Sequence, residues 1–265
     1  MNLEDIDKNE NNLYYVQTEE NMNNFEKEDN IKLSVPMIFL LGLFPGVIIL
    51  IIAFILSSPA IGINLSIYFS IMLAIAFGLI PTELGILKYF AWKNKKKIKD
   101  LITYNEKTPL IRMILSIIIP SLIALGIFMF FSQYEIKLWG NLFDFIPEWF
   151  KLYNVVIAEL DYLKLWLILA IVFNGLLGPF VEEVYFRGFL LPRMNKFGKL
   201  APFVNVVIFS LYHFFSPWEN ITRILAVTPL AYSVWINKNI RIGIIVHCTL
   251  NTLSCIGAII TVIVL

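Results

Sequence analysis

Charged residues are scarce in this chain of 265 residues: Asp, Glu, Lys and Arg make up only 15%, whereas hydrophobic residues make up 58%. A soluble domain is about a quarter charged. The charges also cluster at the N-terminus and in short loops, which leaves long uncharged stretches between them. A chain of this length has too little interior volume to bury all those stretches in water. The composition excludes a soluble enzyme, a disordered chain and a nucleic-acid binder with a basic face, and it favours a polytopic α-helical membrane protein.

Histidine and cysteine are rarer still, with two residues of each type. Cys248 and Cys255 lie seven residues apart in the last apolar segment, where two thiols on one helix cannot bridge each other. No metal-binding cysteine spacing occurs in the sequence. Cys248 lies beside His247, but neighbours on a helix point about 100° apart, so we expect a buried and chemically inert thiol rather than a nucleophile.

The first residues lack the positive start and the hydrophobic core of a signal peptide. Residues 1–31 instead hold nine acidic residues and two lysines, and they show almost no apolar periodicity. Such a segment buries too little apolar surface to offset the entropy that ordering would cost. We therefore predict a disordered acidic tail over residues 1–31 and a transmembrane domain over residues 32–265.

Long apolar stretches fill the rest of the chain. A helix of about 20 apolar residues crosses a hydrocarbon core of about 30 Å. Seven stretches qualify as predicted spans, at about Leu33–Leu56, Ile63–Trp92, Pro109–Ser132, Tyr162–Leu191, Leu200–Phe215, Ile221–Ile236 and Ile242–Leu265. An aromatic, amphipathic stretch over residues 141–160 is either an interfacial segment or an eighth span. The predicted fold is all-α: a polytopic transmembrane helical bundle with seven to eight spans and a polar cavity within the membrane.

Lysine and arginine gather in three of the short connections between the predicted spans, at residues 93–112, 193–199 and 238–241. The first of these segments alone carries seven cations, whereas the connection Ser57–Gly62 carries none. Cytoplasmic loops of membrane proteins are enriched in lysine and arginine. A count of seven spans therefore places all three cationic loops and the N-terminus in the cytoplasm.

Both histidines and a pair of glutamates lie inside predicted spans. The fourth span contains Glu182, Glu183 and Arg187, and His213 and His247 lie in the fifth and seventh. An ionisable residue at membrane depth is costly unless it is paired or hydrated, so it marks a candidate functional site. At 1.5 Å per helical residue, these residues lie roughly 9 to 20 Å from the cytoplasmic ends of their spans. Their common depth favours one shared polar site over independent packing roles.

Each of these residues alone also has a structural interpretation. A glutamate–arginine pair can hold helices together, a buried histidine can be an ordinary core residue, and Arg187 can extend to the cytoplasmic head groups. Glu83 and Lys88 in the second span are predicted to form an interfacial or helix-packing pair outside the site.

Helical spacing predicts how the side chains of the site pair. Glu183 and Arg187 are four residues apart, which suits an ion pair and leaves Glu182 free to face another partner. A carboxylate and a histidine that share a water molecule can deprotonate it. A histidine with an asparagine supplies donors that stabilise a developing oxyanion. Together such groups suit amide hydrolysis by an activated water. The same spacing of four recurs in two further pairs, Phe209 with His213 and His247 with Asn251.

Three motifs in this order resemble the pattern of the CPBP family of intramembrane proteases, which includes the type II CAAX prenyl endopeptidases and bacteriocin-processing, Abi-like self-immunity proteins. They read EExxxR at residues 182–187, FxxxH at residues 209–213 and HxxxN at residues 247–251. All three fall within residues 162–262, which we predict to be the catalytic core.

The resemblance implies an all-helical membrane fold whose catalytic cavity opens toward the cytoplasm. It implies that Glu182 is the general base and that His213 helps to hold the water. His247 and Asn251 would then stabilise the oxyanion. The implied supporting residues are Glu183, Arg187 and Phe209.

Zinc is the alternative to a metal-free mechanism, because members of this family are also described as metalloproteases. The candidate ligand set is Glu182, His213 and His247. Its spacing differs from the HExxH pattern of zincins. A glutamate-dependent mechanism needs no further ligand, so we expect no tightly bound cofactor.

These observations predict an integral membrane endopeptidase, glutamate-dependent or metal-dependent, in a bacterial cell membrane. Its expected partners are the lipid bilayer and a membrane-associated peptide or protein substrate, such as the leader of a bacteriocin or of a signalling peptide; no nucleic-acid partner is expected. Two alternatives remain open. One is a non-catalytic membrane protein that binds peptides or confers immunity, and the other is a transporter that relays protons through Glu182 and the histidines.

Overall fold

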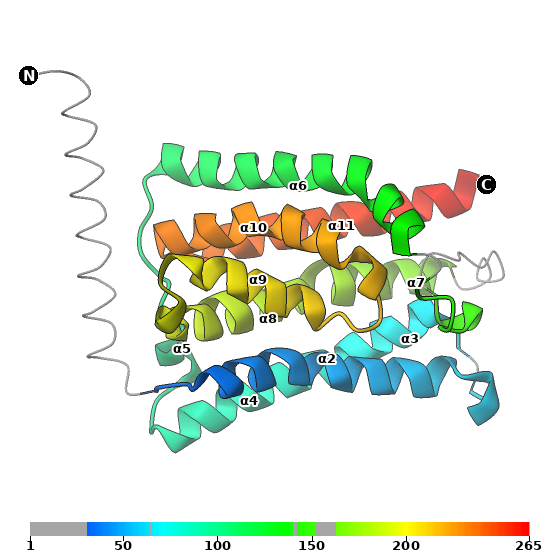
Figure 1. The fold of residues 1–265 in the computed structure, drawn as a ribbon, viewed down its shortest axis with the longest axis horizontal. Helices are drawn as coiled ribbons and strands as arrows, with labels where there is room; N and C mark the ends of the chain where they lie inside the picture. Colours follow the sequence, from blue (N-terminus) through cyan, green and yellow to red (C-terminus); the bar gives the residue numbers. More distant parts are fainter. Residues whose placement is uncertain (1–30, 64, 140–141, 152–162, 265) are drawn as a thin grey trace, which may run out of the picture. The chain divides into compact units, whose positions relative to one another are not determined.

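Helices make up all of the regular secondary structure in the described part of the chain (Figure 1). The only extended pairing among the described residues is an isolated antiparallel bridge between Asn105 and Asn239. The all-α prediction is therefore confirmed. The computed structural model describes residues 31–63, 65–139, 142–151 and 163–264.

Two predictions concern residues that lie largely outside this described part. Of the acidic tail over residues 1–31, only Ile31 is described, and the chain divides into the units Met1–Ser34 and Val35–Leu265. The stretch considered as an eighth span, residues 141–160, is described only over residues 142–151. Those residues form turns and one short 3₁₀ segment, Glu148–Phe150, so they do not begin a spanning helix.

The larger unit contains long helices joined by short turns. Two of the long stretches are interrupted by π-helical segments, which continue the helix with a wider turn. The elements in chain order are α2 (Val35–Ser57), α3 (Ile67–Ala74), η2 (Ile75–Leu79), α4 (Ile80–Lys93), α5 (Ile98–Leu101), α6 (Leu110–Trp139), α7 (Leu163–Leu169), η5 (Ala170–Leu177), α8 (Gly178–Glu182), η6 (Glu183–Leu190), α9 (Ala201–Leu211), α10 (Asn220–Asn237) and α11 (Ile240–Val264).

Five helical stretches are long and apolar enough to cross a membrane, judged by length and composition. They correspond to the first four predicted spans and to the seventh. The fifth and sixth predicted spans are α9, with 11 residues, and α10, with 18 residues, and neither meets the same criteria. A polytopic helical membrane protein is therefore confirmed, whereas the count of seven to eight spans and the polar cavity remain predictions. The five stretches are Val35–Ser57, Ile67–Lys93, Leu110–Trp139, Leu165–Arg193 and Ile240–Ala258.

The apolar faces of these helices serve two different purposes. α10 packs against α6, α9 and α11, and α2 packs against α3 and α9. On α6, in contrast, only 11% of the most apolar window is buried inside the protein. Its exposed side chains include Leu122, Met129 and Phe130. In a membrane protein such a face meets lipid, so α6 is an outer helix of the bundle.

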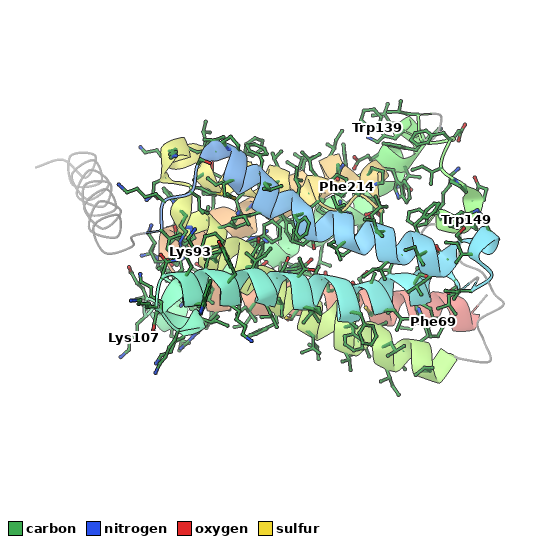
Figure 2. All side chains as sticks on the ribbon, turned by 90° about the horizontal axis from the view of Figure 1, so that it is seen from below. Phe69, Lys93, Lys107, Trp139, Trp149 and Phe214 are labelled. Carbon is green, nitrogen blue, oxygen red and sulfur yellow. The ribbon has the colours of Figure 1, made fainter. Side chains whose placement is uncertain are left out.

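The three cationic connections meet at one end of the bundle. The Glu106 N–H donates to the Lys238 carbonyl at 2.9 Å, which joins the first connection to the third. The Arg193 guanidinium donates to the Leu101 carbonyl at 3.2 Å, which joins the second connection to the first. Figure 2 shows Lys93 and Lys107 at this end and Trp149 at the other. The structure thus brings together the loops that the charge pattern assigned to one side of the membrane.

The helix that carries the two glutamates is irregular. π-helical turns at η5 and η6 flank the short α8, which has Pro179 in its first turn. The backbone carbonyls of η5 accept hydrogen bonds from side chains of α11: Asn174 O from Asn251 Nδ2 at 3.1 Å, and Gly175 O from Thr252 Oγ1 at 3.3 Å. π-helical turns frequently occur at functional sites. Here they tie α11 to the glutamate-bearing segment.

Candidate active site

A fully buried ion pair lies at the centre of the site. Glu183 Oε1 is 3.2 Å from Arg187 Nη1, and neither side chain is exposed to solvent. Arg187 therefore does not extend to the head groups, which was the alternative for this residue. The Phe209 ring covers the guanidinium group, whose carbon lies 4.2 Å from the ring centroid. This is a cation–π contact in a desolvated setting, where such contacts are strongest.

His247 on α11 connects the two glutamates. Its Nδ1 is 2.9 Å from Glu183 Oε1. An ionised carboxylate only accepts hydrogen bonds, so Glu183 in its ion pair with Arg187 accepts one from the Nδ1–H group. Nε2 of the same ring is then directed to Glu182, with 3.7 Å between Nε2 and Oε2. Spacing along the sequence predicted Asn251 as the neighbour of His247, and it did not reveal this contact with Glu183.

Glu182 is the less enclosed of the two glutamates. It is the last residue of α8, and its side chain is 8% exposed, whereas that of Glu183 is not exposed at all. The separation of 3.7 Å between Glu182 Oε2 and His247 Nε2 is too long for a direct hydrogen bond. Both atoms can instead contact a single water molecule at roughly 2.8 Å each. The geometry agrees with the expectation that the Glu183–Arg187 pair leaves Glu182 free for another partner.

His213 follows the end of α9 and is held by its own helix. Its Nδ1 lies 2.8 Å from the Phe209 carbonyl oxygen. A carbonyl only accepts, so Nδ1 carries the hydrogen and Nε2 keeps its lone pair in the neutral ring. The Phe209 ring centroid is 5.0 Å from that of His213 and 5.7 Å from that of His247. Phe209 therefore contacts both imidazoles as well as Arg187.

Asn251 lies one turn after His247 on α11. Its Nδ2 donates to the Asn174 carbonyl of η5 at 3.1 Å, which uses one of its two N–H groups. The predicted oxyanion pair is thus anchored at both members, since His247 is fixed by Glu183 and Asn251 by the π-helical backbone.

Gly243 provides the space that Glu183 occupies. It lies one turn before His247, and a Cβ atom placed on it would collide with Glu183 Oε2 and lie 3.1 Å from the carboxyl carbon. Sequence reasoning missed this residue. A glycine in α11 at the helical spacing of four before the HxxxN motif was the available signal.

Glu83 on α4 was assigned to a packing pair with Lys88, and that prediction is wrong. Glu83 is fully buried, whereas Lys88 is exposed. Neither carboxylate oxygen of Glu83 has a hydrogen-bond partner among the described residues. No pattern in the sequence links Glu83 to the site, because α4 is far from the three motifs along the chain.

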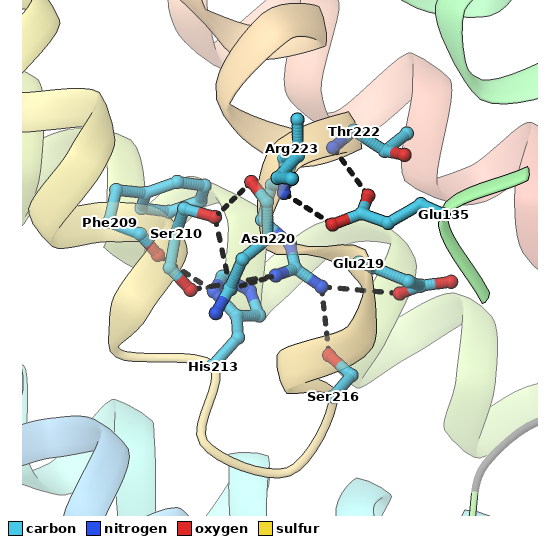
Figure 3. Close-up of polar contacts among 10 residues, drawn as sticks. Glu135, Phe209, Ser210, His213, Ser216, Glu219, Asn220, Thr222 and Arg223 are labelled. Atoms are coloured by element: carbon cyan, nitrogen blue, oxygen red, sulfur yellow. Dashed lines mark hydrogen bonds and ion pairs between the residues drawn. The ribbon is translucent and has the colours of Figure 1, made fainter. Parts of the chain in front are cut away.

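A second group of polar side chains fixes the start of α10, next to the connection that carries His213 (Figure 3). Glu135 on α6 is buried and accepts the N–H groups of Ile221 and Thr222 at 2.7 and 2.6 Å. These N–H groups belong to the first turn of α10, where no acceptor exists within the helix. A carboxylate at this position also compensates the positive end of the helix dipole.

Arg223 extends this arrangement back to the His213 connection. Its Nη2 donates to Ser216 Oγ at 2.8 Å and to Glu219 Oε2 at 3.2 Å, and its Nη1 donates to Asn220 Oδ1 at 3.1 Å. Burial raises the pKa of Glu219 above its ordinary value, and the neighbouring Arg223 acts in the opposite direction. We call Glu135, Ser216, Glu219, Asn220 and Arg223 the capping network.

The three side chains that a zinc ion would require do not form a metal-binding group. Within the described part of the chain, no three His, Cys, Asp or Glu side chains converge closely enough to hold a metal ion. Nδ1 of His247 is engaged by Glu183, and Nδ1 of His213 by the Phe209 carbonyl. Both hydrogen bonds leave Nε2 of the ring as the atom available to a water or to a metal ion, which is also the pattern of metal-bound histidines.

Ionisable residues enclosed by membrane-spanning helices mark a functional site rather than a purely structural bundle. Comparison with known families indicates the class of protein. Residues 164–253 match the family of type II CAAX prenyl endopeptidase Rce1-like proteins. The match covers all three motifs and supports the resemblance to the CPBP/CAAX family of intramembrane proteases. Neither the curated proteins nor the solved structures give a match to this chain.

Proposed function

We propose that this protein is an intramembrane endopeptidase that hydrolyses a peptide bond in a membrane-associated peptide or protein through a water activated by Glu182. The proposal is carried by one observation: Arg187, Glu183, His247 and Glu182 form a continuous chain of contacts that leaves one Glu182 oxygen and Nε2 of His247 within reach of the same water. This chain lies inside the segment that matches the protease family.

In the proposed first step, the Glu182 carboxylate takes a proton from the water while the water oxygen bonds to the carbonyl carbon of the substrate. Nε2 of His213 accepts the second hydrogen of the water and orients it. The carbonyl oxygen becomes an oxyanion in the tetrahedral intermediate. The proton on Glu182 then passes to the amide nitrogen, the C–N bond breaks, and the amine leaves.

The oxyanion is stabilised by His247 and Asn251. In the imidazolium form, His247 gives Nδ1–H to the Glu183 carboxylate and directs Nε2–H to the oxyanion. Glu183 thereby orients the imidazole as the aspartate of a serine protease triad orients its histidine. Arg187 keeps Glu183 in place for this task. Asn251 contributes the N–H that its bond to Asn174 leaves over. Preorganised donors of this kind supply a large share of the rate enhancement in acyl transfer.

The proposed setting is a bacterial cell membrane, with seven to eight spans and a polar cavity that opens to the cytoplasm. The contacts among the three cationic connections support one cytoplasmic end. α2 begins at that end in Figure 1, which supports a cytoplasmic N-terminus. The proposed substrate is the leader of a bacteriocin or signalling peptide, or a segment of a membrane protein, and catalysis by these side chains needs no metal.

The test is a substitution series in proteoliposomes. The probes are a membrane-anchored peptide with a fluorophore and a quencher, and a farnesylated CAAX-type peptide. Glu182→Ala, His213→Ala and His247→Ala should each abolish cleavage while the protein still inserts and unfolds cooperatively.

Other outcomes would overturn the proposal. Probe binding without cleavage by the wild type, unaffected by the three substitutions, identifies a peptide-binding or immunity protein. Proton-coupled flux that depends on Glu182 identifies a transporter.

A further inference from the structure

Glu83 is an unusual residue for the interior of a membrane protein. Its side chain has no solvent exposure, and both carboxylate oxygens lack a hydrogen-bond partner among the described residues. An isolated ionised carboxylate is very costly in an apolar medium, so such a group takes up a proton or finds a partner. A neutral carboxyl group is itself a hydrogen-bond donor that needs an acceptor. We therefore look for a neighbouring group that can accept a hydrogen bond from a protonated Glu83.

The neighbours of Glu83 are the residues of the candidate active site. α4 packs against α8 and η6, the segment that carries both glutamates. α8 ends at Glu182, and η6 contains Glu183 and Arg187, so all three charged side chains belong to the segment that packs against α4. Arg187 is engaged by Glu183. Glu182 faces His247 instead, with 3.7 Å between Oε2 and Nε2, so its Oε1 is the oxygen that could accept from Glu83.

The depth of the two residues agrees with such a pairing. Glu83 lies ten residues before Lys93, at the cationic end of α4, or about 15 Å along a helix. Glu182 lies eleven residues before Arg193, at the same end, along a segment of π-helical and 3₁₀-helical turns. The two residues are therefore separated from the cationic end by a similar length of chain.

We propose that Glu83 is a positioning residue that shares one proton with Glu182 as a carboxyl–carboxylate pair, directly or through one water. The neutral Glu83 O–H donates to one Glu182 oxygen and holds that carboxylate in a single orientation, which leaves the other oxygen for the catalytic water. Two neighbouring carboxyl groups cannot both ionise readily, and sharing a proton is the usual result. The pairing follows from the burial of Glu83, whereas its role in orienting the catalytic carboxylate rests on the proposed function.

The pairing is tested without any substrate, by infrared spectroscopy of the purified full-length protein at neutral pH. The wild type should show the carbonyl stretch of a buried neutral carboxylic acid. Glu83→Gln should remove this band, and Glu182→Gln should shift its frequency. Glu135→Gln is the matched control, because it removes a buried glutamate that caps α10, and it should leave the band unchanged. A band that persists in Glu83→Gln, or that ignores Glu182→Gln, overturns the pairing.

The positioning role is tested by the pH dependence of kcat/KM with the fluorogenic membrane-anchored peptide. In the wild type, loss of the shared proton at alkaline pH should lower kcat/KM. Glu83→Gln keeps a donor that does not titrate, so it should retain kcat/KM at the optimum within fivefold and move the alkaline limb up by about one pH unit or more. Glu83→Leu, which has no donor, should lower kcat/KM at least tenfold across the range.

Failure of this role can be distinguished from failure of the proposed function. If Glu83→Gln and Glu83→Leu both match the wild type at every pH while Glu182→Ala is inactive, the positioning role is wrong and the protease proposal stands. If the infrared pairing is present and Glu182→Ala retains cleavage, the protease mechanism is wrong and the pair has another purpose.

Discussion

The bundle holds two groups of buried polar side chains that differ in how far their hydrogen-bonding capacity is used. In the capping network, Arg223 binds three different side chains and Glu135 accepts two backbone N–H groups. In the candidate active site, Nε and Nη2 of Arg187 and Oε2 of Glu183 have no hydrogen-bond partner among the described residues, and Glu83 beside it has none.

This difference separates a structural role from a functional one. Native proteins satisfy nearly all of their buried polar groups, and the exceptions require an explanation such as a bound water or a catalytic role. The capping network is complete without a ligand, whereas the site retains donors and acceptors that a water and a substrate could use. Burial of charge alone therefore does not distinguish these two groups, whereas their unused hydrogen-bonding capacity does.

The largest effect is expected for Glu183→Gln. The substitution leaves the buried Arg187 without its counter-charge and weakens the hold on His247, so it should lower the free energy of unfolding by about 3 to 5 kcal/mol and abolish cleavage. Denaturant unfolding in mixed micelles measures the first effect and the peptide assay the second. Glu182→Gln is the matched neighbour and should lose activity with little change in stability. Equal stability of the two variants would contradict the difference assigned to the two glutamates.

Gly243→Ala tests whether the position of Glu183 matters, because it moves Glu183 without changing any polar group. The added methyl group collides with the Glu183 carboxylate, and a displacement of about 1 Å at such a site costs about 100-fold in rate. We expect kcat/KM to fall by about 10- to 100-fold. Gly257→Ala on the same helix is the control, because a Cβ atom there meets nothing within 4 Å. Similar activity of the two alanine variants would show that Glu183 does not need its present position.

Glu135→Gln, in the capping network, should lower stability and leave activity nearly unchanged, which is the reverse of the effect expected for Glu182→Gln. The neutral amide accepts the N–H groups of α10 less strongly than a carboxylate does, so the free energy of unfolding should fall by about 1 to 3 kcal/mol. The folded protein should cleave the peptide at close to the wild-type rate. Thermal unfolding and the peptide assay on one preparation measure both quantities. A loss of activity without a loss of stability would place Glu135 in the chemistry.

Arg223→Lys tests whether the network needs the geometry of arginine or only its charge. A lysine cannot reproduce the forked contacts with Ser216, Glu219 and Asn220, so stability should fall by about 1 kcal/mol. The connection that carries His213 becomes less well held, and kcat should fall by less than tenfold. Hydrogen exchange over residues 212–219 should increase, and no change in exchange there would contradict the anchoring role.

The smallest effect is a pH dependence of stability due to Glu219. Because the pKa of Glu219 is raised in the folded protein, the folded state binds this proton more tightly than the unfolded chain does. Stability from this group is fully present below the ordinary pKa of glutamate and is lost as the pH rises through the raised pKa. Glu219→Gln should flatten that part of a melting-temperature profile, whereas Glu148→Gln, on an exposed side chain, should not. Parallel profiles for wild type and Glu219→Gln would contradict the assignment.

Much of the fold could be predicted from the sequence, because hydrophobic length alone identifies the membrane-spanning helices. The predictions of the first four spans and the seventh are confirmed by helices of sufficient length. The sequence also predicted that Glu182, Glu183 and His247 share one site, because the number of residues between each of them and the cationic end of its span indicated a common depth. The cationic loops were assigned to one side for the same reason, and the structure places them in contact.

The pairing within the site could not be predicted, because it depends on how helices are rotated against each other. The contact between His247 and Glu183 joins two different helices, so counting in steps of four along one helix did not reveal it. The partner of Asn251 is a backbone carbonyl of the π-helical segment η5, which side-chain spacing does not report. Glu83 was assigned to a pair with Lys88 from its own helix alone, and the packing of α4 against α8 gives it different neighbours.

The most direct test of the Glu182 mechanism measures metal content and peptide cleavage on the same purified sample, before and after treatment with a chelator. We expect full cleavage by protein that carries no bound metal, with no effect of the chelator and none of added zinc. One zinc ion per chain, with cleavage lost on its removal and restored on its return, would contradict a mechanism in which Glu182 and the two histidines act on water alone.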